Sequence, residues 1–236
     1  MFKKLFLLST LVLCFSQTAS AQYFQTFDFN VSNPLGVVAA MNKFMGSPSG
    51  QQSEATVYLN QYVANGYDTA THQILVVYPT ADSMDADLAR NAAAPEWMTF
   101  LTEIQQAAQL ESEGMGQILA VGGNLNSPLM LPGSGRVLVS YRIQVSDPAA
   151  YASAWTDFTT LNASSSDSVA YLSRVPAYGD YPGTHVAVNT YNSVGEFLTN
   201  GPETLDGWGE FSDRVSSIRE LIGVVVAQEI GVWSPQ

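Results

Sequence analysis

The chain has 236 residues, with nine lysine and arginine residues against 21 aspartate and glutamate residues, and a net charge of −12. A chain this acidic repels phosphate backbones, so nucleic-acid binding is not expected. The length can bury a substantial core, as one large domain or as two small ones.

Residues 1–21 have the three-part pattern of a secretory signal peptide. A lysine pair precedes an apolar stretch at residues 5–15, and small residues at 19–21 suit cleavage before Gln22. The apolar stretch is too short to cross a bilayer of about 30 Å as a helix. We therefore expect export to the periplasm or the extracellular space. The mature chain would have 215 residues, seven of them basic and 21 acidic, for a net charge of −14.

The one cysteine, Cys14, falls within this signal, so no disulfide is expected in the mature chain. Leu13 precedes it, where lipid-anchored precursors resemble one another in carrying a small residue, so no lipid anchor is expected either. The most apolar later stretch, 222–227, has the length of a strand. We expect a soluble product without an integral membrane segment.

Hydrophobic periodicity then predicts a series of strands and helices, with the order strand, helix, strand, strand, helix, strand. The predicted elements of the first half are a strand at 23–31, a helix at 34–45, strands at 56–64 and 71–78, a helical region at 83–110 broken at Pro95, and a strand at 117–121. A linker rich in glycine and proline follows at 122–135.

The second half repeats this order. Asp147 is a predicted N-cap with Pro148 at the first helical position. The predicted elements are a strand at 137–145, a helix at 149–161, strands at 169–175 and 184–191, a helical region at 193–217 interrupted at Gly201-Pro202, and a strand at 221–232.

The two halves also match in sequence, which indicates an internal duplication. Residues 54–78 align with 167–191 without a gap, and Trp97-x-x-Phe100 matches Trp208-x-x-Phe211 at nearly the same shift. The identical pairs in the first window include Tyr58/Tyr171, Leu59/Leu172, Ala64/Ala177, Gly66/Gly179, Thr71/Thr184, His72/His185 and Tyr78/Tyr191. We predict a first repeat at 22–121 and a second at 136–236.

This element order is the βαββαβ pattern of ferredoxin-like folds, an α+β class. Sheets covered by helices on one side must pack their other faces together, so we expect two tandem units that form a pseudo-dimeric α/β barrel within one chain. The chain thus resembles the dimeric α/β-barrel superfamily, which includes antibiotic-biosynthesis-type and haem-degrading monooxygenases, muconolactone isomerases and chlorite-dismutase-like proteins.

His72 and His185 are the candidate catalytic residues, at equivalent strand starts. Either could act as a general base, a proton donor or a ligand. The alternative is a structural Thr-His hydrogen bond at the hairpin, preserved by ancestry. No metal-ligand spacing accompanies the histidines, and no metal or cofactor is expected. In haem-degrading relatives the histidine lies on a helix, whereas both of these are predicted on strands.

Candidate ligand-binding residues fall mostly in strands of the second half: Arg142, Asn189, Arg174 and Tyr191, with Trp208 on a helix. Arg142 aligns with Asp28 of the first half, and both are predicted on the face opposite the large apolar residues. There they could pair or orient an anion, or they could lie on a solvated edge. The Trp208 side chain either packs in the core or offers its ring for stacking against a ligand.

The resemblance implies a small-molecule pocket between sheet and helices, and a cofactor-free oxygenase-like or isomerase-like activity on an apolar or aromatic substrate. If only one half keeps an open pocket, the polar strand residues Asn189 and Arg174 favour the second half. The alternatives are a non-catalytic ligand-binding protein and an interaction module.

Overall fold

The computed structural model describes residues 22–66, 68–179 and 183–235. The predicted signal peptide therefore lies outside the described residues. The first half contains β1 (Tyr23–Val31), α1 (Pro34–Met45), β2 (Thr56–Ala64), β3 (His72–Tyr78), α2 (Ala81–Ala93), α3 (Pro95–Ala107) and β4 (Ala108–Gly123). The second half contains β5 (Val137–Val145), α4 (Pro148–Leu161), β6 (Val169–Ala177), β7 (His185–Tyr191), α5 (Val194–Thr199), α6 (Trp208–Val215) and β8 (Arg219–Trp233).

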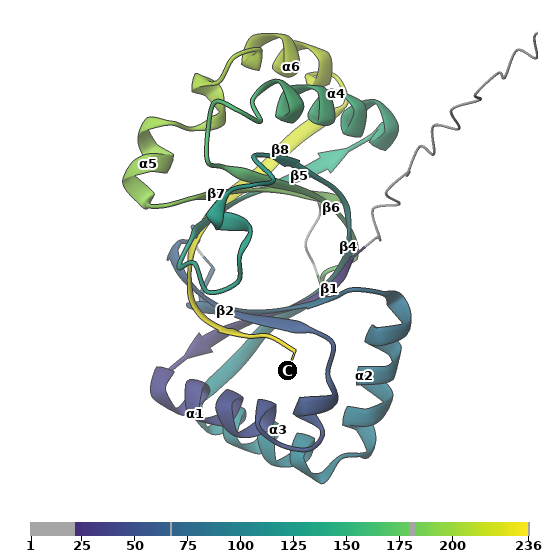
Figure 1. Ribbon diagram of the computed structural model, residues 1–236, viewed down its shortest axis with the longest axis vertical. Coiled ribbons are helices and arrows are strands. Elements are labelled where there is room, and N and C mark those ends of the chain that lie inside the picture. The colour runs from purple at the N-terminus through teal and green to yellow at the C-terminus, as the bar shows by residue number, and fades with distance from the viewer. Residues whose placement is uncertain (1–21, 67, 180–182, 236) are drawn as a thin grey trace, which may run out of the picture.

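Within the described residues the eight strands form one antiparallel sheet, which confirms the predicted α+β class. The strands are hydrogen-bonded in the order β1-β3-β2-β8-β5-β7-β6-β4, and β4 pairs again with β1, so the sheet is a closed barrel. The last strand of each half joins the two halves, because β4 pairs with β6 and β8 pairs with β2. Figure 1 shows the barrel in the centre and the helices of each half on opposite outer sides.

The first helix of each half begins at a side-chain cap followed by proline. The Asn33 side chain accepts a hydrogen bond from the Gly36 amide at 3.0 Å, and the Asp147 side chain accepts one from the Ala150 amide at 3.1 Å. These caps satisfy amides that have no partner within the helix, and proline at the next position has no amide to satisfy. Asp147 is therefore the N-cap that the sequence predicts.

In each half an apolar core lies between the outer face of the barrel and the helices. In the first half Trp97 contacts Phe44 and Phe100, with ring centroids 5.2 and 5.1 Å apart. In the second half Trp208 contacts Phe158 and Phe211, at 5.9 and 5.7 Å. Burying such rings supplies much of the apolar stabilisation of each half.

Several predicted boundaries were wrong. The strand predicted at 117–121 begins nine residues earlier, at Ala108, and the preceding helix ends at Ala107 rather than at residue 110. The segment 109–116 is polar and contains two glycines, so it lacks the apolar alternation of a strand. The helical region predicted at 193–217 consists of α5, a short 3₁₀ turn at Pro202–Thr204 and α6.

No helix in the described part of the chain is long and apolar enough to span a membrane.

Candidate functional site

Successive side chains of β7 point to opposite faces of the sheet. Val186 and Val188 line a cavity inside the barrel, whereas Ala187 and Asn189 line a cavity between the sheet and the helices of the second half. The sheet therefore separates two candidate sites, which we call the barrel cavity and the helix-side cavity.

The helix-side cavity has a volume of about 200 Å³ and mostly apolar walls. Aromatic side chains dominate these walls: Tyr141, Tyr151, Trp155, Phe158, Trp208 and Phe211. Asn189 supplies an amide from the sheet, and Glu203 and Arg219 supply charged groups. A few polar groups among aromatic walls are typical of small-molecule pockets.

Tyrosines of this cavity and its edge stay protonated near neutral pH. Burial raises the pKa of Tyr141, and the neighbouring Tyr191 and Glu203 raise it further. Burial also raises the pKa of Tyr191, which packs against Phe197 beside the cavity, while a hydrogen bond with Asn189 lowers it. These phenols therefore act as hydrogen-bonding groups rather than as bases.

The two histidines occupy equivalent positions at the strand starts. His72 Nδ1 lies 2.9 Å from Thr71 Oγ1, and His185 Nδ1 lies 2.9 Å from Thr184 Oγ1. Each threonine hydroxyl also accepts a backbone amide at 3.0 Å, from Val31 and from Val145. This geometry matches the structural alternative for the Thr-His pair. The His185 Nε2 atom is buried and has no partner among the described residues.

Burial lowers the pKa of both histidines, and Arg174 lowers that of His185 further. Both imidazoles are therefore neutral at neutral pH. Neither histidine lines the helix-side cavity or the barrel cavity, whose walls are formed by described residues. The chain has two histidines in all, so these cavities do not fit a histidine-ligated haem. The described residues hold no cluster of three or more histidine, cysteine, aspartate or glutamate side chains able to bind a metal ion.

The barrel cavity has a volume of about 410 Å³. Its wall is mostly apolar, with Phe24, Leu75, Val77, Ile118, Leu138, Val175, Val186, Val188, Val225 and Ala227. Ser140 and Ser173 lie among them, opposite Val188 and Val186. Charged groups lie toward both ends. At one end Arg136 Nε is 3.3 Å from Glu229 Oε2, and both side chains are almost fully buried.

At the other end the Asp28 carboxylate is 1% exposed and accepts four hydrogen bonds. The donors are the hydroxyls of Tyr62 and Tyr178, the Ser112 hydroxyl at 3.0 Å and the Gln73 amide at 3.1 Å. Burial and the Asp28 charge both raise the pKa of the two tyrosines, so they remain donors. Four donors replace the water that a buried carboxylate loses.

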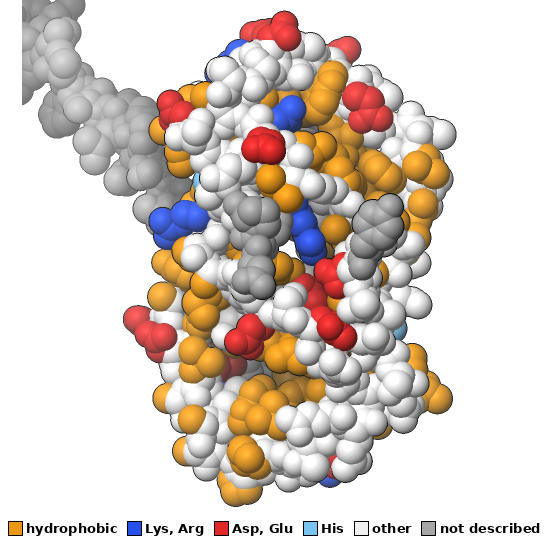
Figure 2. Space-filling model, turned by 180° about the vertical axis from the view of Figure 1, so that it is seen from behind, with side chains coloured by type: hydrophobic (Ala, Val, Ile, Leu, Met, Phe, Trp, Pro, Cys, Tyr) orange, Lys and Arg blue, Asp and Glu red, His pale blue; other side chains and the backbone are white. Residues whose placement is uncertain are grey.

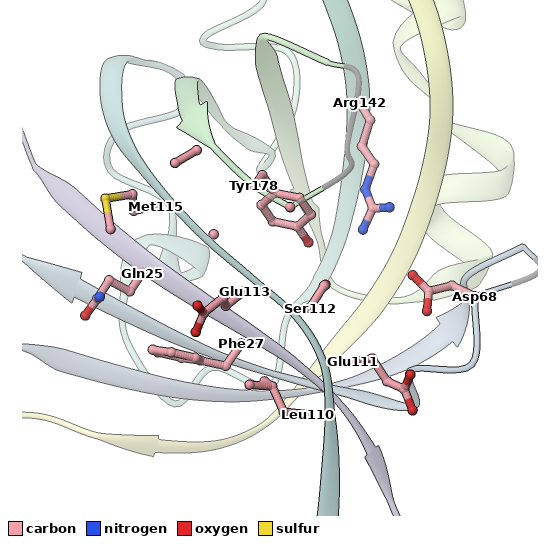
Figure 3. A pocket seen from close by; sticks show the side chains of 13 residues that line it. Gln25, Phe27, Asp68, Leu110, Glu111, Ser112, Glu113, Met115, Arg142 and Tyr178 are labelled. Carbon is pink, nitrogen blue, oxygen red and sulfur yellow. The ribbon is translucent and has the colours of Figure 1, made fainter.

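A third, open pocket lies outside this end of the barrel (Figure 3). Arg142 and Tyr178 line both this pocket and the barrel cavity, so they form the boundary between the two. The carboxylates of Asp68, Glu111 and Glu113 also line the open pocket, and Figure 2 shows acidic and basic side chains gathered at the middle of that face.

The structure thus divides the predicted site residues between faces. Asn189 and Trp208 line the helix-side cavity, and His185 and Tyr191 lie on the same outer face of β7. Arg142 instead faces the barrel cavity. His185, Arg142 and Asn189 therefore do not share one cavity, because the alternation of side chains along β5 points residue 142 into the barrel.

Arg174 is exposed, and its guanidinium lies 3.4 Å from Gln117 Oε1 on β4. His72 lies on the outer face of the first half, away from all of these.

Sequence reasoning missed the groups that surround Asp28. Tyr62 and Gln73 belong to neighbouring strands, and Tyr178 comes from the other half of the chain. Strand periodicity does place Asn60, Tyr62 and Gln73 on inward faces. The meeting of these residues depends on strand register, which the sequence does not specify alone.

No protein-family model matches the sequence. A comparison with curated proteins finds no match either.

Solved structures are similar in fold. One is described as a "putative monooxygenase" from Lactobacillus acidophilus, with a TM-score of 0.58 and 10% identity over 91% of this chain and 96% of that chain. An anthrone oxidase-like protein has a TM-score of 0.57 and 11% identity, over 92% and 94%. A chlorite dismutase-like protein has a TM-score of 0.53 and 10% identity, over 89% and 95%. These neighbours belong to the dimeric α/β-barrel superfamily, and the chain shares their fold.

Proposed function

We propose that this chain, which has the dimeric α/β-barrel fold, is an exported protein that binds a small apolar or aromatic molecule in the helix-side cavity of its second half. The cavity itself carries this proposal, because it combines aromatic walls with the amide that Asn189 projects from the sheet. Its 200 Å³ volume is of the order that accommodates about one aromatic ring system.

The aromatic walls favour a flat, uncharged ligand. Trp155, Trp208 and Phe158 offer ring faces and edges for stacking, while Asn189 can hydrogen-bond a carbonyl or hydroxyl group on the ligand. Asn189 and Trp208 are the ligand-binding residues of this proposal. His185, Tyr191 and Arg174 would act at its edge on the same face, and Arg142 and His72 have no part in it.

The enzymatic version is a cofactor-free oxygenase-like activity. It is supported by the descriptions of the neighbours as monooxygenase and anthrone oxidase-like. The alternative, binding without chemistry, is supported by the described cavity walls, which include no histidine and whose Tyr141 has a raised pKa. A general base poised near neutral pH would need another group.

Anthrone separates the two versions. Titration under nitrogen measures binding alone, and Trp155 and Trp208 in the cavity wall report it through quenched tryptophan fluorescence. Under air, oxygenation would convert the anthrone methylene to the carbonyl of anthraquinone, with the second oxygen atom released as water. Binding without faster oxidation than in buffer supports the non-catalytic version, and faster oxidation supports the enzyme. No quenching by anthrone or by smaller aromatic compounds would contradict the proposal.

The matched variants are Ala187→Val and Val188→Ile. Residue 187 faces the helix-side cavity and residue 188 faces the barrel cavity. Ala187→Val should weaken anthrone binding because its methyl groups enter the cavity, whereas Val188→Ile should leave binding unchanged. The reverse pattern would place the ligand elsewhere.

Export is tested separately, by expressing the full chain and measuring the mass of the product outside the cytoplasm. The expected N-terminal residue is Gln22. A product that keeps residues 1–21, or that stays in the cytoplasm, would contradict the export part of the proposal. The duplication is a further part of the proposal, supported by the repeated element order and the equivalent Thr-His pairs.

A further inference from the structure

We propose that the barrel cavity is a second binding site, separate from the helix-side cavity, for an uncharged and largely apolar molecule that carries a hydroxyl or N–H donor. The donor binds the Asn60 side-chain carbonyl. The proposal depends on the direction in which this amide is held, on its missing partner and on the walls around it.

The cavity walls determine the size and polarity of a ligand that fits. Ten apolar side chains from seven of the strands line the cavity, and its 410 Å³ lies within the range of small-molecule pockets, roughly 300–1,000 Å³. An apolar cavity of this size is favourably filled by an apolar body, since the walls lose dispersion contacts when nothing occupies it.

The orientation of Asn60 follows from the buried carboxylate at the end of the barrel. Asp28 accepts a hydrogen bond from the Gln73 side-chain NH₂ group, which also donates to the Tyr62 hydroxyl at 3.1 Å. The Gln73 carbonyl must then face the other way, where it accepts from the Asn60 NH₂ group at 3.4 Å. The orientation of the Asn60 side-chain amide is thereby fixed, and its carbonyl oxygen is the atom that remains for a hydrogen bond with a ligand.

That carbonyl oxygen has no hydrogen-bond partner among the described residues, although Asn60 is 2% exposed and lines the cavity. Such an acceptor has lost its hydrogen bonds to water without gaining others, which is unfavourable. The Thr26 hydroxyl, 3% exposed and also on the cavity wall, likewise lacks a partner among the described groups. A ligand with a donor group would supply the hydrogen bond that the Asn60 carbonyl lacks, and it could also reach the Thr26 hydroxyl.

The surroundings of Asn60 select a neutral donor. In the strand register Asn60 lies between Gln73 on β3 and Glu229 on β8, so acceptor groups flank it. The Glu229 charge is already compensated by Arg136, and Asp28 is enclosed by four donors. A charged ligand would lose its hydration without a counter-charge at this position, whereas a hydroxyl or N–H group loses little.

The test compares 1-naphthol with 1-methoxynaphthalene, which has the same ring system but no donor, by isothermal titration calorimetry on the purified protein. The expected result is that 1-naphthol binds about tenfold more tightly, because the ether leaves the Asn60 carbonyl unpaired. No binding of either compound, or equal affinity for both, would overturn the proposal.

Asn60→Leu removes the acceptor. It should bring the ratio of the 1-naphthol affinity to the 1-methoxynaphthalene affinity to about one, without weakening binding of the ether. Asn60→Gln retains an uncharged amide carbonyl and should retain a preference for 1-naphthol, which separates loss of the acceptor from a general disturbance of the barrel. A ratio that survives in Asn60→Leu would overturn the role of this side chain.

Two further variants locate the probe. Val188→Phe narrows the barrel cavity and should reduce the preference for 1-naphthol over the ether, whereas Ala187→Val narrows the helix-side cavity and should leave that preference unchanged. The opposite pattern would assign the naphthalenes to the helix-side cavity and overturn the second site. The helix-side proposal itself would survive that outcome.

Discussion

The Tyr178 hydroxyl donates a hydrogen bond to the Asp28 carboxylate, although 150 residues separate the two in the chain. Tyr178 belongs to the second half and Asp28 to the first, so this bond ties the halves together at one end of the barrel. The tyrosine ring lies directly over Gly114 of β4, where an added Cβ would come within 2.0 Å of the ring. Glycine at 114 is therefore a packing requirement of this contact.

Removing the hydroxyl with Tyr178→Phe should lower the free energy of unfolding by about 1–2 kcal/mol, because a buried carboxylate loses one of its four donors. Gly114→Ala should act on the same contact by displacing the ring. The double variant should then cost less than the sum of the two, as measured by urea unfolding. Full additivity would show that the glycine does not act through Tyr178.

The Arg136–Glu229 ion pair is nearly fully buried, so its two charges should be strongly coupled. Glu229→Gln keeps an acceptor for the Gly135 amide, which is bound at 3.1 Å, but leaves the guanidinium without its counter-charge. Arg136→Met leaves the carboxylate uncompensated. We expect each single change to cost about 3–5 kcal/mol and the double change to cost clearly less than their sum.

A double-mutant cycle by urea unfolding measures this coupling, with Lys43–Glu103 as the exposed control. That control pair should couple by no more than about 1 kcal/mol. Equal coupling in the two cycles would contradict the importance of burial.

The sequence predicts the element order because apolar periodicity and helix caps are local signals. Asp147 followed by Pro148 is an example, since the cap and its amide partner are three residues apart. The β4 boundary was missed because Glu111 to Gly116 have little apolar character, and their strand conformation depends on pairing with β1. Tertiary pairing here overrides local preference.

The candidate sites were predictable in part. Side chains alternate between the two faces along β5 and β7, so Arg142 points into the barrel and Asn189 points toward the helices. This placement follows from the two-residue period of a strand once its register is known. Asn60 and Glu229 lie opposite each other across β2 and β8, which are far apart in sequence. Nothing local in the sequence indicates that pairing.

Acid should destabilise the protein partly through its histidines. Burial lowers the pKa of His72 and His185 in the folded state below the ordinary value of 6.5. As the pH falls below 6.5, the unfolded chain takes up protons that the folded chain does not. The free energy of unfolding therefore falls from about pH 6.5 down to the folded pKa, and it is unaffected by these groups at pH 8.

The check is urea unfolding at a series of pH values for the wild type and for His72→Gln/His185→Gln. The double variant should show a smaller decrease between pH 7 and pH 5. Parallel curves for the two proteins would mean that the histidines do not titrate differently in the folded and unfolded chains.

Cutting the linker should leave the two halves associated. Residues 131–134 are exposed, so a protease site inserted after Gly133 would be accessible and should be tolerated. The β4–β6 and β2–β8 ladders do not pass through this segment, and they hold the halves together by backbone hydrogen bonds. Native mass spectrometry of the cleaved protein should detect both fragments in one complex, which separates in urea. Two independently folded fragments would contradict this, because separation would expose unpaired edges on β2, β4, β6 and β8, and such edges are prone to aggregate.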